Sequence, residues 1–344
     1  MTVAQAKAFV AEHTKPQTKW LGPTTGPKAP HLKLTLAWVS ADQAYTPYIY
    51  WGNGIKAAAE TLGWKVVTFD GHGTVTGTLA AMNQALALNP AVIITPADAH
   101  ALQKPIRAAI ARGIPVIGIH ATAFPGPDPE LGLYMNITSN PADIGRSEAA
   151  YVIAATNGTG HDIHIVAAEY AIARFKAKAT IEPIKNCPGC KFLEDVDVPL
   201  GSVAERMPSV ISGLIARYGQ SWWMTTCCDG YYTYVAAALR ASGSSPDKIH
   251  LVGSDGPPAS YEMIRKGNYE VATVPEPSTL FGYEAVDAAV RAFADQPPAQ
   301  FIQPTYIVTK KDIDAEGGAQ NQFIPSNNFA CHYKNIWLGT HNPC

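Results

Sequence analysis

Apolar and polar residues follow two rhythms along the chain, which predict short buried strands that alternate with amphipathic helices. The run 249–253, rich in β-branched residues, is typical of a buried parallel strand. After Ser278, apolar residues recur at helical spacing, as on a helix with one buried face. From residue 32 the first series has strands at 34–39, 65–69, 92–95 and 116–119, separated by helices at 48–62, 78–88 and 99–111. Such βαβ repetition predicts a parallel sheet with helices on both faces.

A proline-rich stretch at 123–132 interrupts this rhythm before a strand at 134–137, and a second series then begins. Its strands are expected at 163–166, 191–196, 222–225, 249–253 and 271–274, with helices at 144–156, 174–184, 203–218, 231–241 and 261–266. The sequence therefore predicts an α/β fold of two doubly wound parallel-sheet lobes joined by a multi-strand hinge.

The order of elements also predicts how the chain divides. The helix that Ser278 is expected to cap returns to the first lobe, and a strand at 305–308 crosses back to the second. We expect four parts: an N-terminal helix and strap at 1–32, lobe 1 at 33–138 plus 277–304, lobe 2 at 139–276 plus 305–330, and a C-terminal tail at 331–344. A ligand held between such lobes would be enclosed by hinge closure.

Composition and charge narrow the classes of function. The chain has 344 residues, of which 47% are hydrophobic and 16% charged, and its net charge is -2. We expect no nucleic-acid partner, because neutralising phosphates needs a clustered basic surface. No apolar run reaches the roughly 18 residues of a membrane span. Residues 1–13 are too polar for a signal peptide, so we expect a cytosolic protein or a mature form that begins at Met1.

Six cysteines bear on the cellular compartment. Cys187 and Cys190 bracket a Pro-Gly pair, Cys227 and Cys228 are adjacent, and Cys331 and Cys344 frame the tail. The even count favours disulfides and an oxidising compartment over the unpaired thiols of a cytosolic protein. A zinc site made from the first four is the weaker alternative, because adjacent cysteines are awkward tetrahedral ligands. A vicinal Cys227–Cys228 bridge facing a ligand is a further possibility. We expect no metal and no cofactor.

Two acids are the first candidates for ligand contact. Asp255 ends a buried strand, at the position where open α/β sheets bind ligands, and Glu276 is held between two prolines after the next strand. Each candidate has a structural alternative. Asp255 can cap a turn. Three further ligand-binding candidates have such alternatives too: Asp229 can cap the helix that follows it, Arg174 can pair with Glu169, and His120 can be an interior histidine.

Several short stretches, taken in order, match one family. They are Gly113–His120 (GIPVIGIH), Ser139-Asn140 with Gly145 five positions on, Arg174, Asp229 before the alanine-rich helix that ends at Arg240, Val252–Gly256 (VGSDG) and Ala272–Glu276 (ATVPE). Over residues 33–310 the chain resembles the periplasmic sugar-binding proteins of ABC transporters, of the ribose-binding type. The resemblance implies a non-enzymatic monomer in the periplasm that passes a small sugar or sugar alcohol to an ABC permease.

The resemblance also implies roles for particular residues. By this resemblance, Arg174 is expected to donate to sugar hydroxyls and Asp255 to accept from two of them. Ionised side chains suit these roles because they make stronger hydrogen bonds than neutral ones. The family has a polar group such as an amide where Glu276 stands, and an Asp-Arg pair where this chain has His120-Ala121. The other ligand-binding candidates are Asn140, Asp229, Cys228, which replaces a common asparagine, and the aromatic residues Tyr45, Tyr48, Trp51 and Tyr231, which suit the C–H face of a sugar ring.

Two other classes of protein stay open. One is the effector-sensing core of a sugar-responsive regulator, disfavoured because no helix-turn-helix precedes residue 33. The other is a hydrolase that uses Asp255 and Glu276, although no nucleophile elbow, metal-binding His pair or phosphate loop accompanies them. Two carboxylates and one guanidinium leave the expected site negative, which favours neutral or amino sugars over acidic ones.

Overall fold

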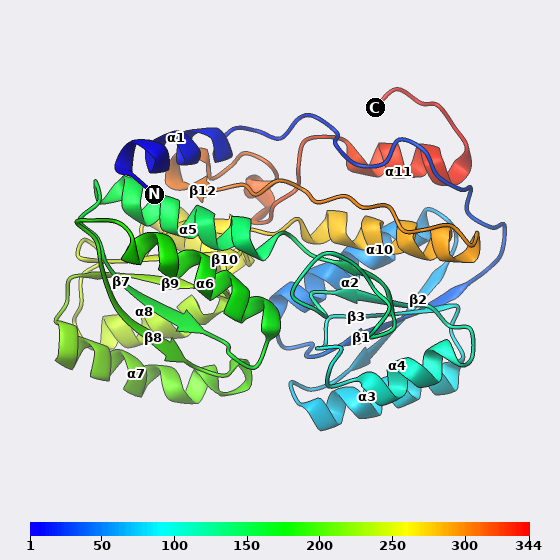
Figure 1. The fold of residues 1–344 in the computed structure, drawn as a ribbon, viewed down its shortest axis with the longest axis horizontal. Helices are drawn as coiled ribbons and strands as arrows, with labels where there is room; N and C mark the ends of the chain where they lie inside the picture. The colour runs from blue at the N-terminus through cyan, green and yellow to red at the C-terminus, as the bar shows by residue number, and fades with distance from the viewer. The chain divides into compact units, whose positions relative to one another are not determined.

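The chain forms two compact units, which a computed structural model describes over residues 1–344 (Figure 1). Unit 1 comprises Met1–Pro16, Asn140–Glu276 and Pro304–Phe323, and unit 2 comprises Gln17–Ser139, Pro277–Gln303 and Ile324–Cys344. The chain therefore passes five times from one unit to the other. The structure assigns residues 1–16 to unit 1, and residues 17–32 and 331–344 to unit 2, where the sequence led us to expect a separate strap and tail.

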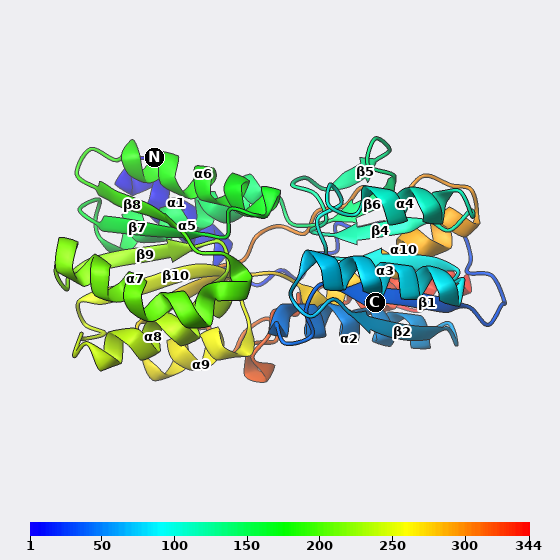
Figure 2. The same cartoon turned by 90° about the horizontal axis from the view of Figure 1, so that it is seen from below.

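Unit 1 is built on a six-stranded sheet whose strands run parallel except at one edge. In spatial order the strands are β12 (Val308–Thr309), β11 (Glu270–Pro275), β10 (Ile249–Asp255), β9 (Trp222–Thr226), β7 (His161–Val166) and β8 (Lys191–Asp197). Figure 2 shows β10, β9, β7 and β8 of this sheet side by side. Only β12 pairs antiparallel, with β11. The carboxyl ends of the parallel strands therefore share one edge of the sheet.

Helices cover both faces of this sheet. In Figure 1, α1 (Val3–His13) and α5 (Pro141–Ala155) lie above it, and α7 (Val203–Tyr218) and α8 (Tyr232–Ala241) lie below. Helix α6 (Ala171–Lys185) packs along α5, and α9 (Pro258–Lys266) connects β10 to β11. The close α5–α6 packing needs a glycine, because a Cβ at Gly145 would lie 2.3 Å from the carbonyl oxygen of Lys176. This contact fixes the position of α6 against α5.

Unit 2 repeats the architecture with a second six-stranded sheet. Its order is β2 (Lys65–Asp70), β1 (Thr35–Ser40), β3 (Val92–Thr95), β4 (Val116–Ile119), β6 (Leu133–Ile137) and β5 (Gly126–Asp128). Helices α2 (Thr46–Glu60) and α10 (Ser278–Phe293) pack together on one face, and α3 (Val75–Leu88) and α4 (Gln103–Ile110) cover the other (Figure 1). The predicted pair of doubly wound α/β lobes is confirmed.

The C-terminal helix α11 (Phe329–Leu338) belongs to unit 2 and packs against α10. Asp287 accepts hydrogen bonds from the Trp337 indole at 2.9 Å and from Arg291 Nε at 2.7 Å. Arg291 also donates to the Thr25 carbonyl at 2.8 Å, which ties the extended N-terminal segment to the same helix. The carboxyl end of the chain is therefore an integral part of this unit.

Two disulfides are present, Cys187–Cys190 after α6 and Cys331–Cys344 around α11. The sequence favoured disulfides over unpaired thiols without fixing the pairs, and the structure forms them at these two places. The zinc alternative is wrong, because Cys187 and Cys190 are bonded to each other.

Most of the remaining differences from the predicted elements lie at their ends. Strand β5 was not expected; it contains Pro127, which an edge strand tolerates because its outward N–H needs no partner. Helix α4 begins at Gln103 rather than residue 99, because Asp98 accepts the His100 N–H at 2.8 Å in a turn. Ser278 does not cap α10; it is the first helical residue and makes no side-chain cap bond. The strand expected at 305–308 is only Val308–Thr309.

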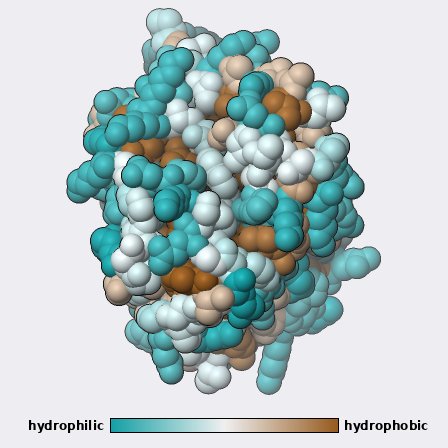
Figure 3. All heavy atoms as spheres, turned by 90° about the vertical axis from the view of Figure 1, so that its left-hand side faces the viewer, coloured by the Kyte–Doolittle hydropathy of each residue, from teal (hydrophilic) through white to brown (hydrophobic).

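The surface carries no large apolar region on the face shown in Figure 3, where hydrophobic side chains form small patches among polar ones. None of the helices combines the length and the apolar character that crossing a bilayer requires.

Candidate functional site

Three charged side chains meet at the carboxyl edge of the unit 1 sheet. Lys176 Nζ lies 3.0 Å from Asp255 Oδ1 and 3.3 Å from Glu276 Oε1. Lys176 comes from α6, Asp255 is the last residue of β10, and Glu276 directly follows β11. The Glu276 N–H also donates to the Asp255 carbonyl at 3.2 Å. We call Lys176, Asp255 and Glu276 the charged cluster.

The charged cluster is largely removed from water. The side chains of Lys176, Asp255 and Glu276 are 3%, 9% and 1% exposed, so Asp255 is the member that solvent reaches best. Burial by itself lowers the pKa of Lys176, but Asp255 and Glu276 outweigh it and hold that pKa well above its ordinary value. Lys176 is therefore a fixed cation that sits between two carboxylates.

Sequence reasoning missed Lys176. It lies on the buried side of α6 together with Ala173, Ala177 and Thr180, which recur at helical spacing. The available signal was a lysine inside this stripe of small residues, because a cation there needs an anionic partner. The resemblance pointed to the neighbouring Arg174 instead.

The backbone at Asp255 is unusual. Its φ is 90°, and Gly256 follows with a φ of 65°. Residues other than glycine rarely adopt positive φ, and such strained positions concentrate at ligand sites. A Cβ at Gly256 would lie 2.3 Å from Pro275 Cβ, so glycine is required for the turn. The two residues together turn the chain at the end of β10, where the Asp255 carboxylate pairs with Lys176.

Asp229 holds the turn at Asp255 and Gly256 in place through hydrogen bonds of its side chain. It is buried, and its carboxyl group accepts the Gly256 N–H at 3.2 Å and the Thr273 hydroxyl. Burial, assisted by the nearby charge of Asp255, raises the pKa of Asp229 well above its usual range. The alternative role as a helix cap is wrong, because the residue before α8 is Tyr231 and no side chain caps that helix. Ligand contact by Asp229 stays a prediction.

Arg174 and Asn140 occupy helix starts in unit 1. Arg174 is exposed and is the fourth residue of α6, not the first. Its guanidinium donates to the Ala168 carbonyl, whereas Glu169 accepts the Leu200 N–H at 2.7 Å. Asn140 caps α5 by accepting the Ala142 N–H at 2.9 Å. Ligand contact by Arg174 and Asn140 stays a prediction.

Tyr231 and Cys228 follow β9 on either side of Asp229. Tyr231 is buried in the unit 1 core, and its hydroxyl donates to the Val198 carbonyl at 2.7 Å. This arrangement satisfies its one polar atom internally, as in core packing. Cys228 is partly exposed beside Cys227. Ligand contact by either residue stays a prediction.

The expected residues of unit 2, which are Tyr45, Tyr48, Trp51 and His120, form an aromatic group, and Phe281 packs against Trp51 and His120. His120 directly follows β4 with a φ of 61°, and its ring centroid is 4.7 Å from Trp51. Tyr48 lies 5.3 Å from Trp51 and 5.0 Å from Tyr45, between ring centroids. Tyr48 and Trp51 are mostly buried, whereas Tyr45 is half-buried. Their ligand contacts stay predictions.

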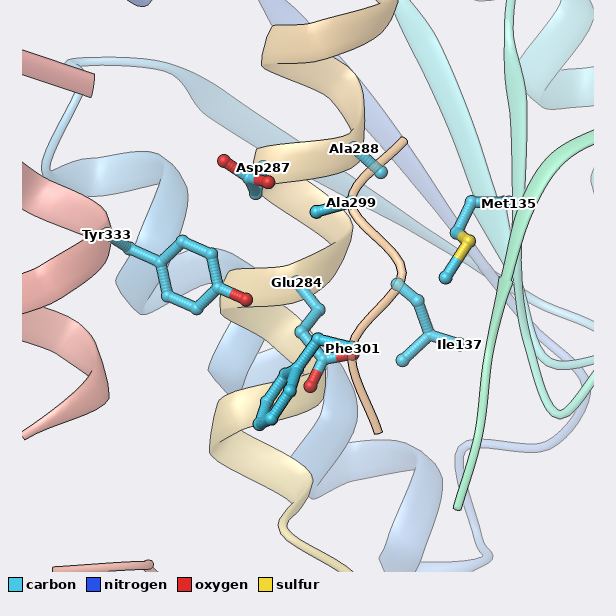
Figure 4. Close-up of a pocket in the computed structure, with 8 residues that line it drawn as sticks. All are labelled: Met135, Ile137, Glu284, Asp287, Ala288, Ala299, Phe301 and Tyr333. Atoms are coloured by element: carbon cyan, nitrogen blue, oxygen red, sulfur yellow. The ribbon is translucent and has the colours of Figure 1, made fainter. Parts of the chain in front are cut away.

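Unit 2 also encloses a small cavity between β6, α10 and α11 (Figure 4). Its volume is about 10 Å³, which admits about one water molecule and excludes a sugar. Glu284 lines it, and its Oε1 has no hydrogen-bond partner. Burial, with a contribution from Asp287, raises the pKa of Glu284 well above its usual range.

Replacing Glu284 with glutamine is expected to stabilise the protein at alkaline pH. A group whose folded-state pKa is raised supports the fold below its ordinary pKa of 4.5 and loses that support as the pH rises. Glu284→Gln removes this loss, by roughly 1–3 kcal/mol at pH 8–9 and almost nothing near pH 4. Urea unfolding across pH 4–9 measures the difference, with exposed Glu130→Gln as the control. Parallel pH profiles for Glu284→Gln and the wild type would contradict it.

The family model described as periplasmic binding protein domain matches residues 36–297. No curated protein sequence matches the chain.

Several solved structures share the fold. A sugar ABC transporter protein from Yersinia enterocolitica is 17% identical with a TM-score of 0.73, covering 91% of this chain and 100% of that one. An ABC transporter solute-binding protein from Agrobacterium vitis with bound α-D-tagatopyranose is 18% identical with a TM-score of 0.74, covering 85% and 99%.

A second solute-binding protein from Agrobacterium vitis, with bound allitol, is 18% identical with a TM-score of 0.71, covering 82% of this chain and 97% of that one. These likenesses agree with the two α/β units, and the family model extends over most of both. The chain belongs to the periplasmic binding protein domain family.

Proposed function

We propose that this protein is the solute-binding component of an ABC importer and that its charged cluster binds a small neutral sugar or polyol. The observation that carries the proposal is the ion-paired meeting of Lys176, Asp255 and Glu276 at the carboxyl edge of a parallel sheet. Ligands bind at that edge in open α/β sheets. The family membership and the sugar and polyol ligands of the solved relatives support the same function.

The chemistry of the charged cluster suits hydroxyl groups. An ionised carboxylate such as that of Asp255 carries several acceptor lone pairs, and hydrogen bonds to an ionised group are about twice as strong as neutral ones. Lys176 and Arg174 together balance Asp255 and Glu276, so the proposed site is close to neutral. The sequence alone, which did not include Lys176, led us to expect a negative site. A balanced site favours an uncharged ligand over an amino sugar.

The other parts of the proposal rest on the family and on the two disulfides. An ABC permease is the expected partner, and a monomer is the expected form. Export to the periplasm agrees with Cys187–Cys190 and Cys331–Cys344, because disulfides persist in oxidising compartments. The hydrolase alternative loses support, since Lys176 pairs with both carboxylates and the named relatives are binding proteins and transporter subunits.

A thermal-shift screen tests the proposal. The panel contains pentoses, hexoses and sugar alcohols, with glucosamine and glucuronate as charged comparisons. We expect at least one neutral member to raise the Tm by several degrees and to be recovered unchanged by chromatography. A panel in which only charged sugars bind would overturn the ligand class, and steady conversion of a bound sugar would overturn the binding function.

Closure of the two units on the ligand is a separate prediction. We expect the radius of gyration from small-angle X-ray scattering to fall when a saturating ligand is added. The ligand binds the closed state more tightly than the open state and therefore stabilises it. A sugar from the panel that gives no thermal shift is the control. An unchanged scattering profile with saturating ligand would contradict hinge closure and leave the binding site itself in place.

A further inference from the structure

Cys227 and Cys228 form a pair of thiols in direct contact. Their sulfur atoms are 3.0 Å apart, whereas the other four cysteines are disulfide-bonded. The segment is held on both sides, since Ser254 Oγ donates to the Cys227 carbonyl at 2.8 Å and the Cys228 N–H donates to Thr226 Oγ1 at 3.4 Å. The backbone that carries the two thiols is therefore held by neighbouring side chains on both sides.

The pair adjoins the charged cluster. Thr226 at the end of β9 is in register with Gly253 of β10. Cys228 and Asp255 each follow their register residue by two positions, at the same edge of the sheet. The electrostatic influence of Cys228 on Lys176 and of Asp255 on Cys228 agrees with this proximity. A change at the two sulfurs is therefore a change at the wall of the proposed binding site.

We propose that Cys227 and Cys228 are a redox modification site, in which a vicinal disulfide forms and changes the affinity of the adjoining site for its ligand. The two thiols lose two electrons and two protons, and one S–S bond forms. A small-molecule or protein disulfide accepts the electrons and protons and is cleaved to two thiols, through a mixed disulfide. The change of affinity rests on the proposed function, whereas formation of the bond does not.

Two properties of the cysteine pair decide how readily this disulfide is reduced and formed. Adjacent Cα atoms are about 3.8 Å apart across a trans peptide, which is shorter than the usual span of a disulfide. The bond is therefore the most readily reduced of the three. The contact with Cys227, together with burial, raises the pKa of Cys228 well above its usual range, so exchange is slow in the folded protein. Oxidation is fastest while the chain folds and the segment is open.

Formation of the bond changes what the site presents to a ligand. Cys228 is the partly exposed member, and its S–H is a weak donor that disappears on oxidation. The oxidised pair offers an apolar surface beside Asp255, which suits the C–H face of a sugar. We therefore expect the oxidised form to bind the ligand more tightly.

Thiol counting tests the covalent step without any ligand. The full chain is refolded with excess oxidised glutathione, then unfolded, alkylated with iodoacetamide and mapped by peptide mass spectrometry. We expect no alkylated cysteine, and after mild reduction we expect alkylation at Cys227 and Cys228 while the other two pairs stay closed. Alkylation of Cys227 and Cys228 in refolded protein whose other pairs are closed would overturn the proposal.

The effect of the disulfide on ligand affinity is tested with the sugar identified in the thermal-shift panel. Titration calorimetry on oxidised and mildly reduced protein is expected to show about a tenfold weaker Kd in the reduced form. A Cys227→Ser/Cys228→Ser double variant is expected to lose this dependence on reductant, and a Cys187→Ser/Cys190→Ser variant to keep it. Equal affinities of the two redox forms would overturn the affinity change. If no sugar binds either form, the proposed function fails, and thiol counting alone decides the modification.

Discussion

Replacing Lys176 with methionine is expected to lower the free energy of unfolding by about 3–5 kcal/mol. The substitution keeps the length of the side chain but leaves the carboxylates of Asp255 and Glu276 buried without the cation that lies 3.0 and 3.3 Å from them. An uncompensated buried charge is among the most destabilising changes a single mutation makes. Equilibrium unfolding in urea measures the loss.

Two further variants separate this effect from a general loss of packing. In the triple variant Lys176→Met/Asp255→Asn/Glu276→Gln no charge is left unpaired, so we expect most of the lost stability to return while ligand binding stays absent. The surface control is Lys178→Met, because the Lys178 side chain is 68% exposed and pairs with Glu182 only at 3.8 Å. We expect it to change stability by no more than about 0.5 kcal/mol. A Lys176→Met variant as stable as the wild type would contradict the ion-paired cluster.

Replacing Asp255 with asparagine is expected to weaken ligand binding by about 30- to 100-fold, which corresponds to losing roughly 2–3 kcal/mol of charge-assisted hydrogen bonding. Asparagine is the suitable substitution, because it tolerates positive φ and Asp255 has a φ of 90°. The turn into Gly256 is therefore retained, and the change is confined to the charge. Titration calorimetry with the sugar from the panel measures the Kd.

The matched control for this loss is Asp143→Asn on the same unit. Asp143 is half-exposed and pairs with Arg146 at 3.0 Å on the surface of α5. We expect that variant to bind the ligand as the wild type does. Circular dichroism confirms that both variants are folded. An Asp255→Asn variant that is folded and keeps the wild-type Kd would remove Asp255 from the site.

The fold was predictable because its signals are local and repeated. Buried parallel strands have short apolar runs, and amphipathic helices have apolar residues at helical spacing. The strands β3 and β4 and the helix α7 were therefore predicted with the bounds that the structure shows. Because the alternation of strands and helices restarts after the proline-rich stretch, we expected lobe 2 to begin at residue 139, and the structure changes unit between Ser139 and Asn140. The placement of residues 1–16 against α5 had no such signal, because it depends on tertiary contacts of α1.

The site was predictable only in part. Asp255 and Glu276 were found because strand ends and flanking prolines are visible in the sequence. Lys176 was missed because pairing between a helix and two strands joins positions that are about 80 and 100 residues apart. The support that Asp229 gives to Gly256 was hidden for the same reason: the hydrogen bond depends on how β10 and the segment after β9 lie together.

A crystal structure with the sugar or polyol identified by the thermal-shift panel tests the central claim most directly. We predict hydroxyl oxygens of the ligand within about 2.6–3.2 Å of the Asp255 carboxylate, with Lys176 still paired to it. Strong density for the ligand at any place remote from Lys176, Asp255 and Glu276 would contradict the account.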